Sequence, residues 1–162
     1  MNIRQAILNA NKVLAKNQIK SAVLDCEILM SSVLQKDRKY VILNLDKKLN
    51  KKNISDFEDL ITKRSLSKPV AYLTKKKDFW KYSFLVSDQI LIPRPDTEIL
   101  IENILKITKQ KSKINILDIG TGSGCILLSI LKDRRDFYGT GIDISKDCIN
   151  ISRINATNLE LS

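Results

Sequence analysis

The chain has 162 residues, 43% of them hydrophobic and 28% charged, a balance typical of a globular protein with one domain or two small ones. It contains no histidine, so catalytic triads and metal sites built on imidazole are excluded within these residues. No apolar run reaches the roughly 18 residues of a membrane span, and the first residues lack the apolar core of a signal peptide, so we expect no membrane partner.

The formal net charge of +10 makes nucleic acid the first partner to consider, because phosphate backbones attract basic proteins. The lysines form short runs, such as Lys47-Lys48 and Lys75-Lys76-Lys77, and aromatic residues are only 6% of the chain, so no stacking platform stands out. We therefore favour lysines spread over solvated faces and expect no nucleic-acid partner. Attraction to an acidic or RNA-associated partner stays open.

The cysteines are few and far apart, without a Cys-x-x-Cys pair. They are Cys26, Cys125 and Cys148. An odd and scattered number favours a reducing compartment over disulfides or zinc. We therefore expect a cytoplasmic protein without a metal site.

The first 75 residues have the apolar spacing of a small helical bundle, which we expect to be the N-terminal domain. A first helix has an inward face formed by residues at helical spacing: Ile3, Ala6, Ile7, Ala10, Val13 and Leu14. A second helix is predicted over 21–34 with Ser21 as its cap, and a shorter one over 38–45. A fourth helix is expected to start at Asn53 or Ser55.

A β-hairpin linker is predicted over 76–95. Residues 78–86 are rich in strand formers, and Ser87-Asp88 offers a turn. Pro95 suits the first turn of a following helix, because proline needs no hydrogen-bond partner for its nitrogen there.

An α/β segment is predicted over 96–162, as the first part of a Rossmann-like domain. Residues 114–117 read as a strand of the buried type, 125–132 as an apolar helix and 138–142 as a second strand. Ser145 is expected to cap a further helix. A doubly wound sheet needs more βα units than these, so we expect a truncated chain with an open strand edge. A second chain that completes the sheet is one partner to consider.

The glycine loop Gly120-Thr121-Gly122-Ser123-Gly124 joins the first of these strands to the helix. Alternating glycines permit positive φ and close approach of a ligand, and the helix N-terminus supplies free N–H groups. A dinucleotide fingerprint would place its third small residue at Cys125, which is an imperfect fit. Asp118 would repel a pyrophosphate, but it can face the cationic amino group of S-adenosyl-L-methionine. We therefore favour S-adenosyl-L-methionine as the cofactor over a dinucleotide.

The second predicted strand is followed by Asp143. An acidic side chain at this place can accept hydrogen bonds from both ribose hydroxyls of a nucleoside. Helix capping is the alternative role, but Ser145 already offers a cap. Because the carboxyl ends of adjacent parallel strands meet at one edge, Asp118 and Asp143 are expected at the same crevice.

Sequence segments spread over most of the chain resemble, in their order, those of one enzyme family. They are Lys68–Thr74 (KPVAYLT), Phe79-Trp80, Leu91–Glu98 (LIPRPDTE) and Asn115–Gly124 (NILDIGTGSG). The chain thereby resembles the HemK/PrmC family, the glutamine methyltransferases of peptide-chain release factors. The segment LIPRPDTE is the most family-specific, whereas the glycine loop alone would indicate only a class I methyltransferase.

This resemblance implies methyl transfer from S-adenosyl-L-methionine to the side-chain amide of the glutamine in the release factor's Gly-Gly-Gln motif. It implies a release-factor docking role for the helical domain and a methyltransferase domain after the hairpin. The predicted cofactor-binding residues are Asp118, Gly120, Thr121, Gly122, Ser123, Gly124 and Asp143. Arg94, Pro95 and Glu98 would border the active site, and a plain linker that starts a helix is the alternative for them.

The chain departs from the family where glycine is usual. Ser67, Lys75 and Lys81 stand at three such places, so we expect strained turns there.

The family's catalytic motif, Asn-Pro-Pro-Tyr, is absent from these 162 residues, because no proline follows an asparagine. In the family its side-chain amide and neighbouring carbonyls orient the substrate nitrogen, a poor nucleophile that depends on positioning. The catalytic residues are therefore unknown, and we expect no turnover by the chain alone. Two alternatives stay open: a DNA or RNA adenine N6-methyltransferase, which the positive charge favours mildly, and a non-catalytic fragment that docks release factors.

Overall fold

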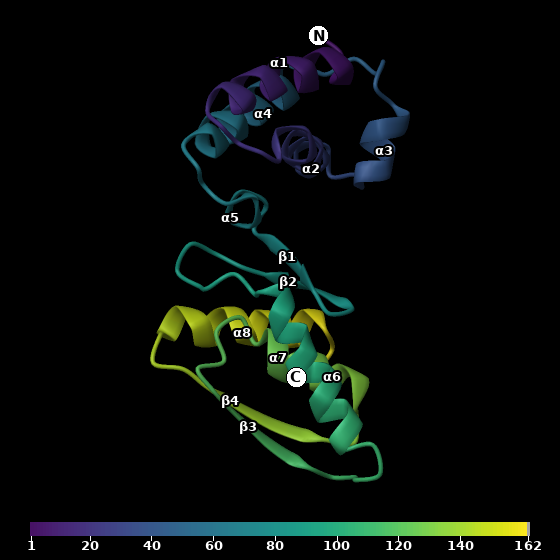
Figure 1. The fold of residues 1–162 in the computed structure, drawn as a ribbon, viewed down its shortest axis with the longest axis vertical. Coiled ribbons are helices and arrows are strands. Elements are labelled where there is room, and N and C mark those ends of the chain that lie inside the picture. Colours follow the sequence, from purple (N-terminus) through teal and green to yellow (C-terminus); the bar gives the residue numbers. More distant parts are fainter. Residues whose placement is uncertain (162) are drawn as a thin grey trace. The chain divides into compact units, whose positions relative to one another are not determined.

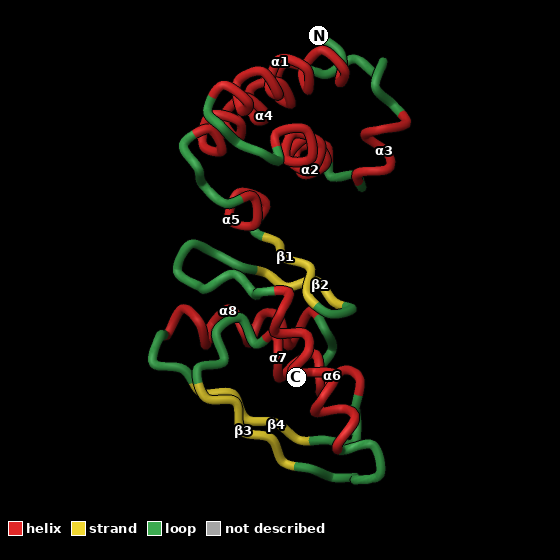
Figure 2. The backbone as a smooth tube through the Cα atoms, in the orientation of Figure 1, coloured by secondary structure: helices red, strands yellow, loops and turns green. Residues whose placement is uncertain are grey.

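The computed structural model describes residues 1–161, and the chain divides between Thr74 and Lys75 into two compact units. We call Met1–Thr74 the N-terminal unit and the remainder the C-terminal unit (Figure 1). The N-terminal unit is helical and the C-terminal unit mixes strands with helices (Figure 2). Each has a hydrophobic core of its own.

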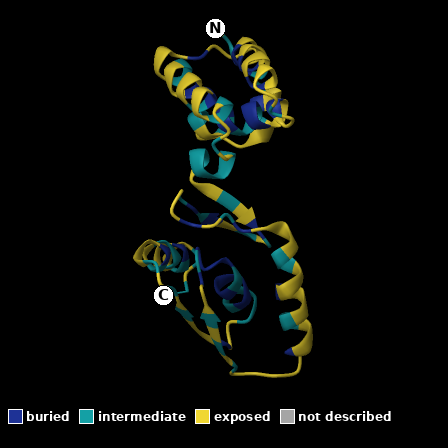
Figure 3. Ribbon diagram, turned by 60° about the vertical axis from the view of Figure 1, so that its left-hand side comes forward, coloured by how far each residue is buried: buried dark blue, intermediate teal, exposed yellow. Residues whose placement is uncertain are grey.

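The N-terminal unit is built from helices that pack their apolar stripes together. They are α1 (Ile3–Lys16), α2 (Ala22–Leu34), α3 (Arg38–Leu43), α4 (Lys51–Ser65) and α5 (Val70–Thr74). Their buried faces point inward and their outer faces are exposed (Figure 3). The predicted inner face of α1 is buried except at Val13, which is 44% exposed and borders a groove between α1 and α4.

Helix α2 starts directly after Ser21, as predicted, but the predicted capping bond of Ser21 and the predicted start of the fourth helix were wrong. Ser21 makes no capping hydrogen bond, since its hydroxyl donates to the Asp25 carboxylate instead, at 2.9 Å. Helix α4 starts at Lys51 rather than at Asn53 or Ser55. There Asn50 is the cap, and its Oδ1 accepts the N–H of Asn53 at 2.7 Å.

Two of the three places that lack a family glycine adopt a backbone that favours glycine. The φ angle is +65° at Ser67 and +56° at Lys75. In the hairpin turn it is Trp80, with φ +57°, and not the neighbouring Lys81 that takes the left-handed conformation. Side chains with a Cβ are disfavoured there, so these turns carry conformational strain.

Replacing Ser67 by glycine is therefore expected to stabilise the N-terminal unit by about 0.5–1 kcal/mol. Ser55→Gly, a matched change in the exposed middle of α4, is expected to destabilise it by a similar amount, because glycine loses more backbone entropy in a helix. Urea unfolding of both variants measures the difference. Equal shifts of both midpoints in the same direction would contradict the assignment of strain to Ser67.

The C-terminal unit starts with a β-hairpin of β1 (Lys76–Phe79) and β2 (Tyr82–Leu85), closed by the pair Phe79 and Tyr82. The chain reverses at Trp80-Lys81, so the turn predicted at Ser87-Asp88 was wrong for the hairpin. The left-handed conformation of Trp80 allows this tighter reversal. A short 3₁₀ turn η1 (Pro95–Thr97) then leads into α6 (Glu98–Ile107).

The α/β part follows with β3 (Asn115–Ile119), α7 (Cys125–Asp133), β4 (Tyr138–Ile142) and α8 (Lys146–Asn158). Strands β3 and β4 pair in parallel, with Ile119 opposite Ile142, and α7 makes the crossover between them. In Figures 1 and 3, α7 and α8 lie on the same side of this sheet. The fold is the start of a Rossmann-like α/β domain, as expected from the sequence.

The prediction of a strand buried on both faces was wrong for β3. Leu117 is 59% exposed and Ile119 is 75% exposed, while Ile116 on the opposite face packs against the core. Helix α7 contacts the strands from that inner side. Apolar strands of this kind are fully buried only when helices cover both faces, and among residues 1–161 only one face is covered.

Residues 1–161 contain no helix that is both long and apolar enough to cross a membrane. Cys26, Cys125 and Cys148 are buried thiols without a disulfide. Burial, reinforced by the charges of Asp25 and Glu27, raises the pKa of Cys26 to about 12, so this thiol is a poor nucleophile at neutral pH.

Candidate functional site

The glycine loop turns through three left-handed residues before α7. The φ angles are +79° at Gly120, +57° at Gly122 and +79° at Gly124. A Cβ added at Gly120 or Gly122 would meet no atom within 4 Å, whereas one at Gly124 would lie 2.8 Å from Leu128 Cδ1. The first two glycines therefore leave open space beside the backbone, and the third allows the loop to pack against α7.

This difference predicts unequal effects on stability. Gly124→Ala is expected to destabilise the C-terminal unit by about 2–4 kcal/mol, since strain and overpacking add. Gly122→Ala is expected to cost about 1 kcal/mol, from backbone strain alone. Urea unfolding of the two variants tests whether Gly124→Ala loses more stability than Gly122→Ala. A larger loss for Gly122→Ala would show that the contact of Gly124 with Leu128 does not matter.

Hydrogen bonds fasten the loop to the end of β4. The N–H groups of Gly120 and Thr121 both donate to the Ile142 carbonyl, at 2.9 and 3.0 Å. The N–H of Gly122 donates to Asp143 Oδ2 at 2.9 Å, and Ser145 N–H donates to the other carboxylate oxygen at 2.9 Å. These bonds from Ser145 and Gly122 lower the pKa of Asp143, so the carboxylate stays ionised at neutral pH.

The second predicted carboxylate, Asp118, lies on β3 opposite Gly141 of β4. Its Oδ2 accepts the hydroxyl of Thr121 at 2.8 Å. The lack of a side chain at Gly141 makes room for this threonine, since a Cβ there would lie 3.0 Å from Thr121 Oγ1. The two carboxylates thus contact the same glycine loop from adjacent strands, Asp118 through Thr121 and Asp143 through Gly122.

A hollow of about 420 Å³ opens at this edge of the sheet. It is lined by Ile119, Gly120, Ile142, Asp143 and Ile144. Ile144 is fully exposed, although it follows an ionised carboxylate. The sequence prediction missed this residue, and the signal for it was an apolar side chain directly after the acid that ends β4.

The donor and acceptor set fits a nucleoside-bearing cofactor such as S-adenosyl-L-methionine. Asp143 offers an ionised carboxylate to hydroxyl groups, the open side of Gly120 and Gly122 admits a ligand close to the backbone, and Ile144 offers an apolar wall to a flat ring. The N-terminus of α7 adds a positive dipole end beside the loop. The pyrophosphate of a dinucleotide would lie near the carboxylates of Asp118 and Asp143. Repulsion between these negative charges disfavours a dinucleotide.

The residues predicted to border the active site do not line this hollow, and their place at the active site stays a prediction. Arg94 and Pro95 are exposed at the start of η1, and Glu98 is the first residue of α6. Glu98 Oε1 accepts the backbone N–H of Trp80 at 2.9 Å and so holds the hairpin turn. None of the three lines the hollow at Gly120 and Asp143.

The same hairpin turn is fixed from a second side by Asp133, the last residue of α7. Its carboxylate accepts hydrogen bonds from Trp80 Nε1 at 2.9 Å, from Lys81 Nζ at 2.7 Å and from the Tyr82 hydroxyl. Burial would raise the pKa of Asp133, but these hydrogen bonds outweigh it and lower the pKa. We call these four residues the Asp133 cluster.

The Asp133 cluster is expected to stabilise the C-terminal unit less at alkaline pH, where Tyr82 ionises. Burial and the hydrogen bond to Asp133 raise the pKa of Tyr82 to about 12 from an ordinary 10.0. A group whose pKa is higher in the folded state stabilises it fully below the unfolded pKa, so this contribution is lost between about pH 10 and 12. Urea midpoints measured from pH 8 to 12 are expected to fall less steeply in Tyr82→Phe than in the wild type. Parallel curves would contradict the role of this phenol.

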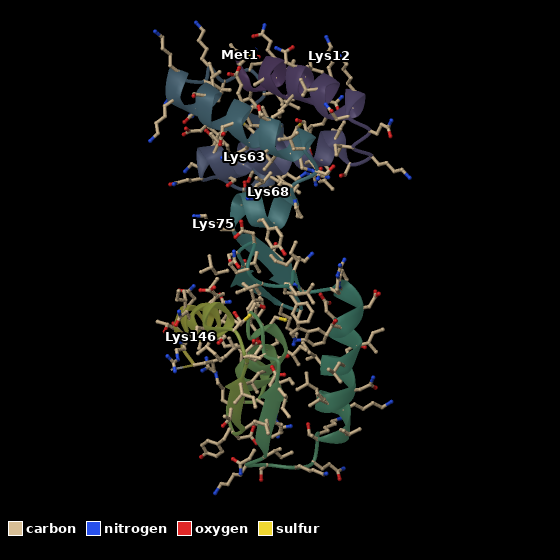
Figure 4. The ribbon with its side chains drawn as sticks, turned by 90° about the vertical axis from the view of Figure 1, so that its left-hand side faces the viewer. Met1, Lys12, Lys63, Lys68, Lys75 and Lys146 are labelled. Atoms are coloured by element: carbon tan, nitrogen blue, oxygen red, sulfur yellow. The ribbon has the colours of Figure 1, made fainter. Side chains whose placement is uncertain are left out.

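The positive charge is shared between both units. Figure 4 labels Lys12 of α1, Lys63 of α4 and Lys146 of α8, which come from separate elements. Many of the lysines are exposed, and this distribution matches solvated faces more than a single basic stripe.

Known proteins match both halves of the chain. The PrmC N-terminal domain matches residues 5–74, and a methyltransferase domain matches residues 94–161. The chain is 43% identical over 161 residues to the release factor glutamine methyltransferase of Buchnera aphidicola, which covers 99% of the chain and 58% of that protein. It is 37% identical to the release factor glutamine methyltransferase of Clostridium acetobutylicum, covering 56% of that protein.

The chain also resembles, at 32% identity over 185 residues, part of a bifunctional methyltransferase of Rickettsia conorii. It therefore spans somewhat more than half the length of the first two relatives and about a third of the third. The two domain matches follow each other in the order of the two structural units. These matches show a PrmC N-terminal domain followed by a methyltransferase domain, which is the domain order that the resemblance to the HemK/PrmC family implies.

Proposed function

We propose that the chain binds S-adenosyl-L-methionine at the glycine loop and serves the methylation of the glutamine side-chain amide in the Gly-Gly-Gln motif of peptide-chain release factors, in the cytoplasm. The observation that carries the proposal is the open space beside Gly120 and Gly122, next to the ionised Asp143. Two relatives are release factor glutamine methyltransferases, which supports a release factor as the substrate.

In the proposed complex, the site residues contact different parts of the cofactor. Asp143 accepts hydrogen bonds from the ribose hydroxyls, and Ile144 packs against the base. Asp118 faces the amino group of the cofactor, and the N–H groups of the glycine loop hold its polar end. The bound cofactor supplies a methyl group on a sulfonium, while the residues of this chain bind and orient it.

We propose that methyl transfer needs a further segment that positions the acceptor amide. The Asn-Pro-Pro-Tyr motif implied by the family resemblance does not occur in these 162 residues. The relatives are longer than the part that this chain matches. The exposed side chains of Leu117 and Ile119 on β3 form an apolar face that such a segment, on the same or a second polypeptide, would cover as it extends the sheet.

The predicted domain over 1–75, which contains the N-terminal unit, is proposed to dock the release factor. The hairpin over 76–95 is proposed to act as the linker, and residues 96–162 to hold the cofactor. The match of residues 5–74 to the PrmC N-terminal domain supports the first of these roles.

Two measurements on the purified chain test the proposal. Calorimetric titration with S-adenosylhomocysteine is expected to give one binding site, and binding too weak to detect at millimolar ligand would sink the cofactor assignment. Incubation with a release factor and radiolabelled S-adenosyl-L-methionine is expected to give no methyl transfer. Methylation by the chain alone would disprove the need for a further segment. Methyl transfer to an adenine-containing DNA or RNA in a parallel incubation would support the nucleic-acid alternative instead.

A further inference from the structure

Asn155 is a buried polar residue in the last turn of an α-helix, where neither burial nor helix propensity favours asparagine. It lies in α8 with 1% of its surface exposed. A buried amide without partners is costly, so its hydrogen bonds indicate why this residue is there.

The Asn155 side chain bonds to backbone groups of two segments that are distant in sequence. Its Oδ1 accepts the N–H of Leu85 at 2.7 Å, and its Nδ2 donates to the Leu85 carbonyl at 3.1 Å. The same Nδ2 donates to the carbonyl of Ser123 at 2.8 Å. Leu85 ends strand β2 of the hairpin, and Ser123 belongs to the glycine loop.

The glycine loop is otherwise held from the side of the sheet. The end of β4 contacts Gly120 and Thr121, and Asp143 contacts Gly122. The bond from Asn155 reaches the loop at Ser123, from the opposite flank and just before α7 starts. Both N–H groups of the amide are occupied, so the hairpin and the loop cannot separate without leaving buried carbonyls unpaired.

We propose that Asn155 is a positioning residue, which locks the glycine loop to the β-hairpin so that order in one depends on order in the other. This proposal rests on the proposed function in one respect, because it takes the ligand of the glycine loop to be the cofactor. By linkage, a ligand that orders the loop also orders the end of the hairpin, and a loosened hairpin weakens that ligand's binding.

The lock is tested first without ligand, by NMR amide exchange in the full chain. Asn155→Ala removes all three hydrogen bonds, and Asn155→Asp keeps the acceptor for Leu85 N–H but replaces the amide donor with a carboxyl group. Ile101→Ala in α6 is the control, because this buried core residue takes no part in the three hydrogen bonds of the lock. Urea unfolding measures how much each variant destabilises the C-terminal unit, and exchange rates are compared after correction for that loss.

In Asn155→Ala, the amides of Gly122, Gly124 and Leu85 are expected to exchange at least tenfold faster than in Ile101→Ala. In Asn155→Asp, the two glycine amides are expected to lose protection while Leu85 keeps it. Loop amides that exchange as slowly in Asn155→Asp as in Ile101→Ala would overturn the proposal, even if Asn155→Ala fails to fold.

A second arm uses S-adenosylhomocysteine as the probe. Its dissociation constant is expected to rise at least tenfold in Asn155→Asp and to change less than threefold in Ile101→Ala. If the wild-type chain does not bind the probe, the proposed function fails, but the exchange rates measured without ligand still decide on the lock. If the probe binds equally to both variants, the linkage between loop and hairpin is refuted.

Discussion

Asp143→Ala is expected to weaken binding of S-adenosylhomocysteine by 100-fold or more. The carboxylate would lose its hydrogen bonds to both ribose hydroxyls, and hydrogen bonds to a charged group contribute about 1.5–3 kcal/mol each. The substitution would also remove the acceptor for the N–H groups of Gly122 and Ser145, each of which donates a hydrogen bond of 2.9 Å to Asp143. The glycine loop would then be less well ordered before the ligand binds. The lost contacts to the ribose and the loss of order in the loop both weaken binding. Calorimetric titration of the purified variant measures the dissociation constant.

The matched control is Asp147→Ala, which removes the same charge from an exposed position in the first turn of α8. Its dissociation constant is expected to stay within threefold of the wild type. Were both variants to lose affinity equally, general electrostatics and not the placement of Asp143 would explain the effect. Were neither to lose affinity, the ligand would bind elsewhere.

Asp133→Ala is expected to destabilise the C-terminal unit by about 3–4 kcal/mol. The change leaves the indole N–H of Trp80 and the hydroxyl of Tyr82 without their acceptor in a partly buried place, and it leaves the Lys81 ammonium unpaired. Removing one partner of such a network costs more than the net worth of the hydrogen bonds, because the groups that remain were taken out of water. Thermal unfolding followed by circular dichroism measures the loss.

Asp136→Ala supplies the control, since Asp136 pairs with Arg134 at the surface at 3.0 Å. Exposed ion pairs contribute about 0–1 kcal/mol, so a small change is expected there. A loss below about 1 kcal/mol in Asp133→Ala would mean that water replaces its carboxylate and that the Asp133 cluster does not fix the hairpin.

The elements of the chain could be predicted from the sequence where local pattern and burial agree. Alternating glycines between a strand and an apolar helix specify the loop. The two predicted parallel strands place Asp118 on β3 and Asp143 directly after β4. The helical domain follows from apolar spacing. The family resemblance added what spacing alone does not contain, namely the order of the domains and the substrate class. The domain matches agree with that order.

The parts that sequence did not predict depend on partners distant along the chain. Whether Ser21 caps a helix depends on Asp25, and the place of the hairpin turn depends on the left-handed backbone of Trp80, held by Glu98. The exposure of Leu117 depends on which face of the sheet is covered. The contacts of Asn155 connect residues that are 32 and 70 positions apart, so no local pattern could reveal them.

The hairpin turn also gives the molecule an optical label. Trp80 is the only tryptophan of the chain. Its indole N–H donates to Asp133, and the Lys81 ammonium lies 5.1 Å from the centroid of its ring. Indole emission depends on nearby charges and on exposure to water, so its wavelength and intensity report on this turn alone. Ligand binding at the glycine loop, if transmitted through Asn155, should become visible as a change in fluorescence.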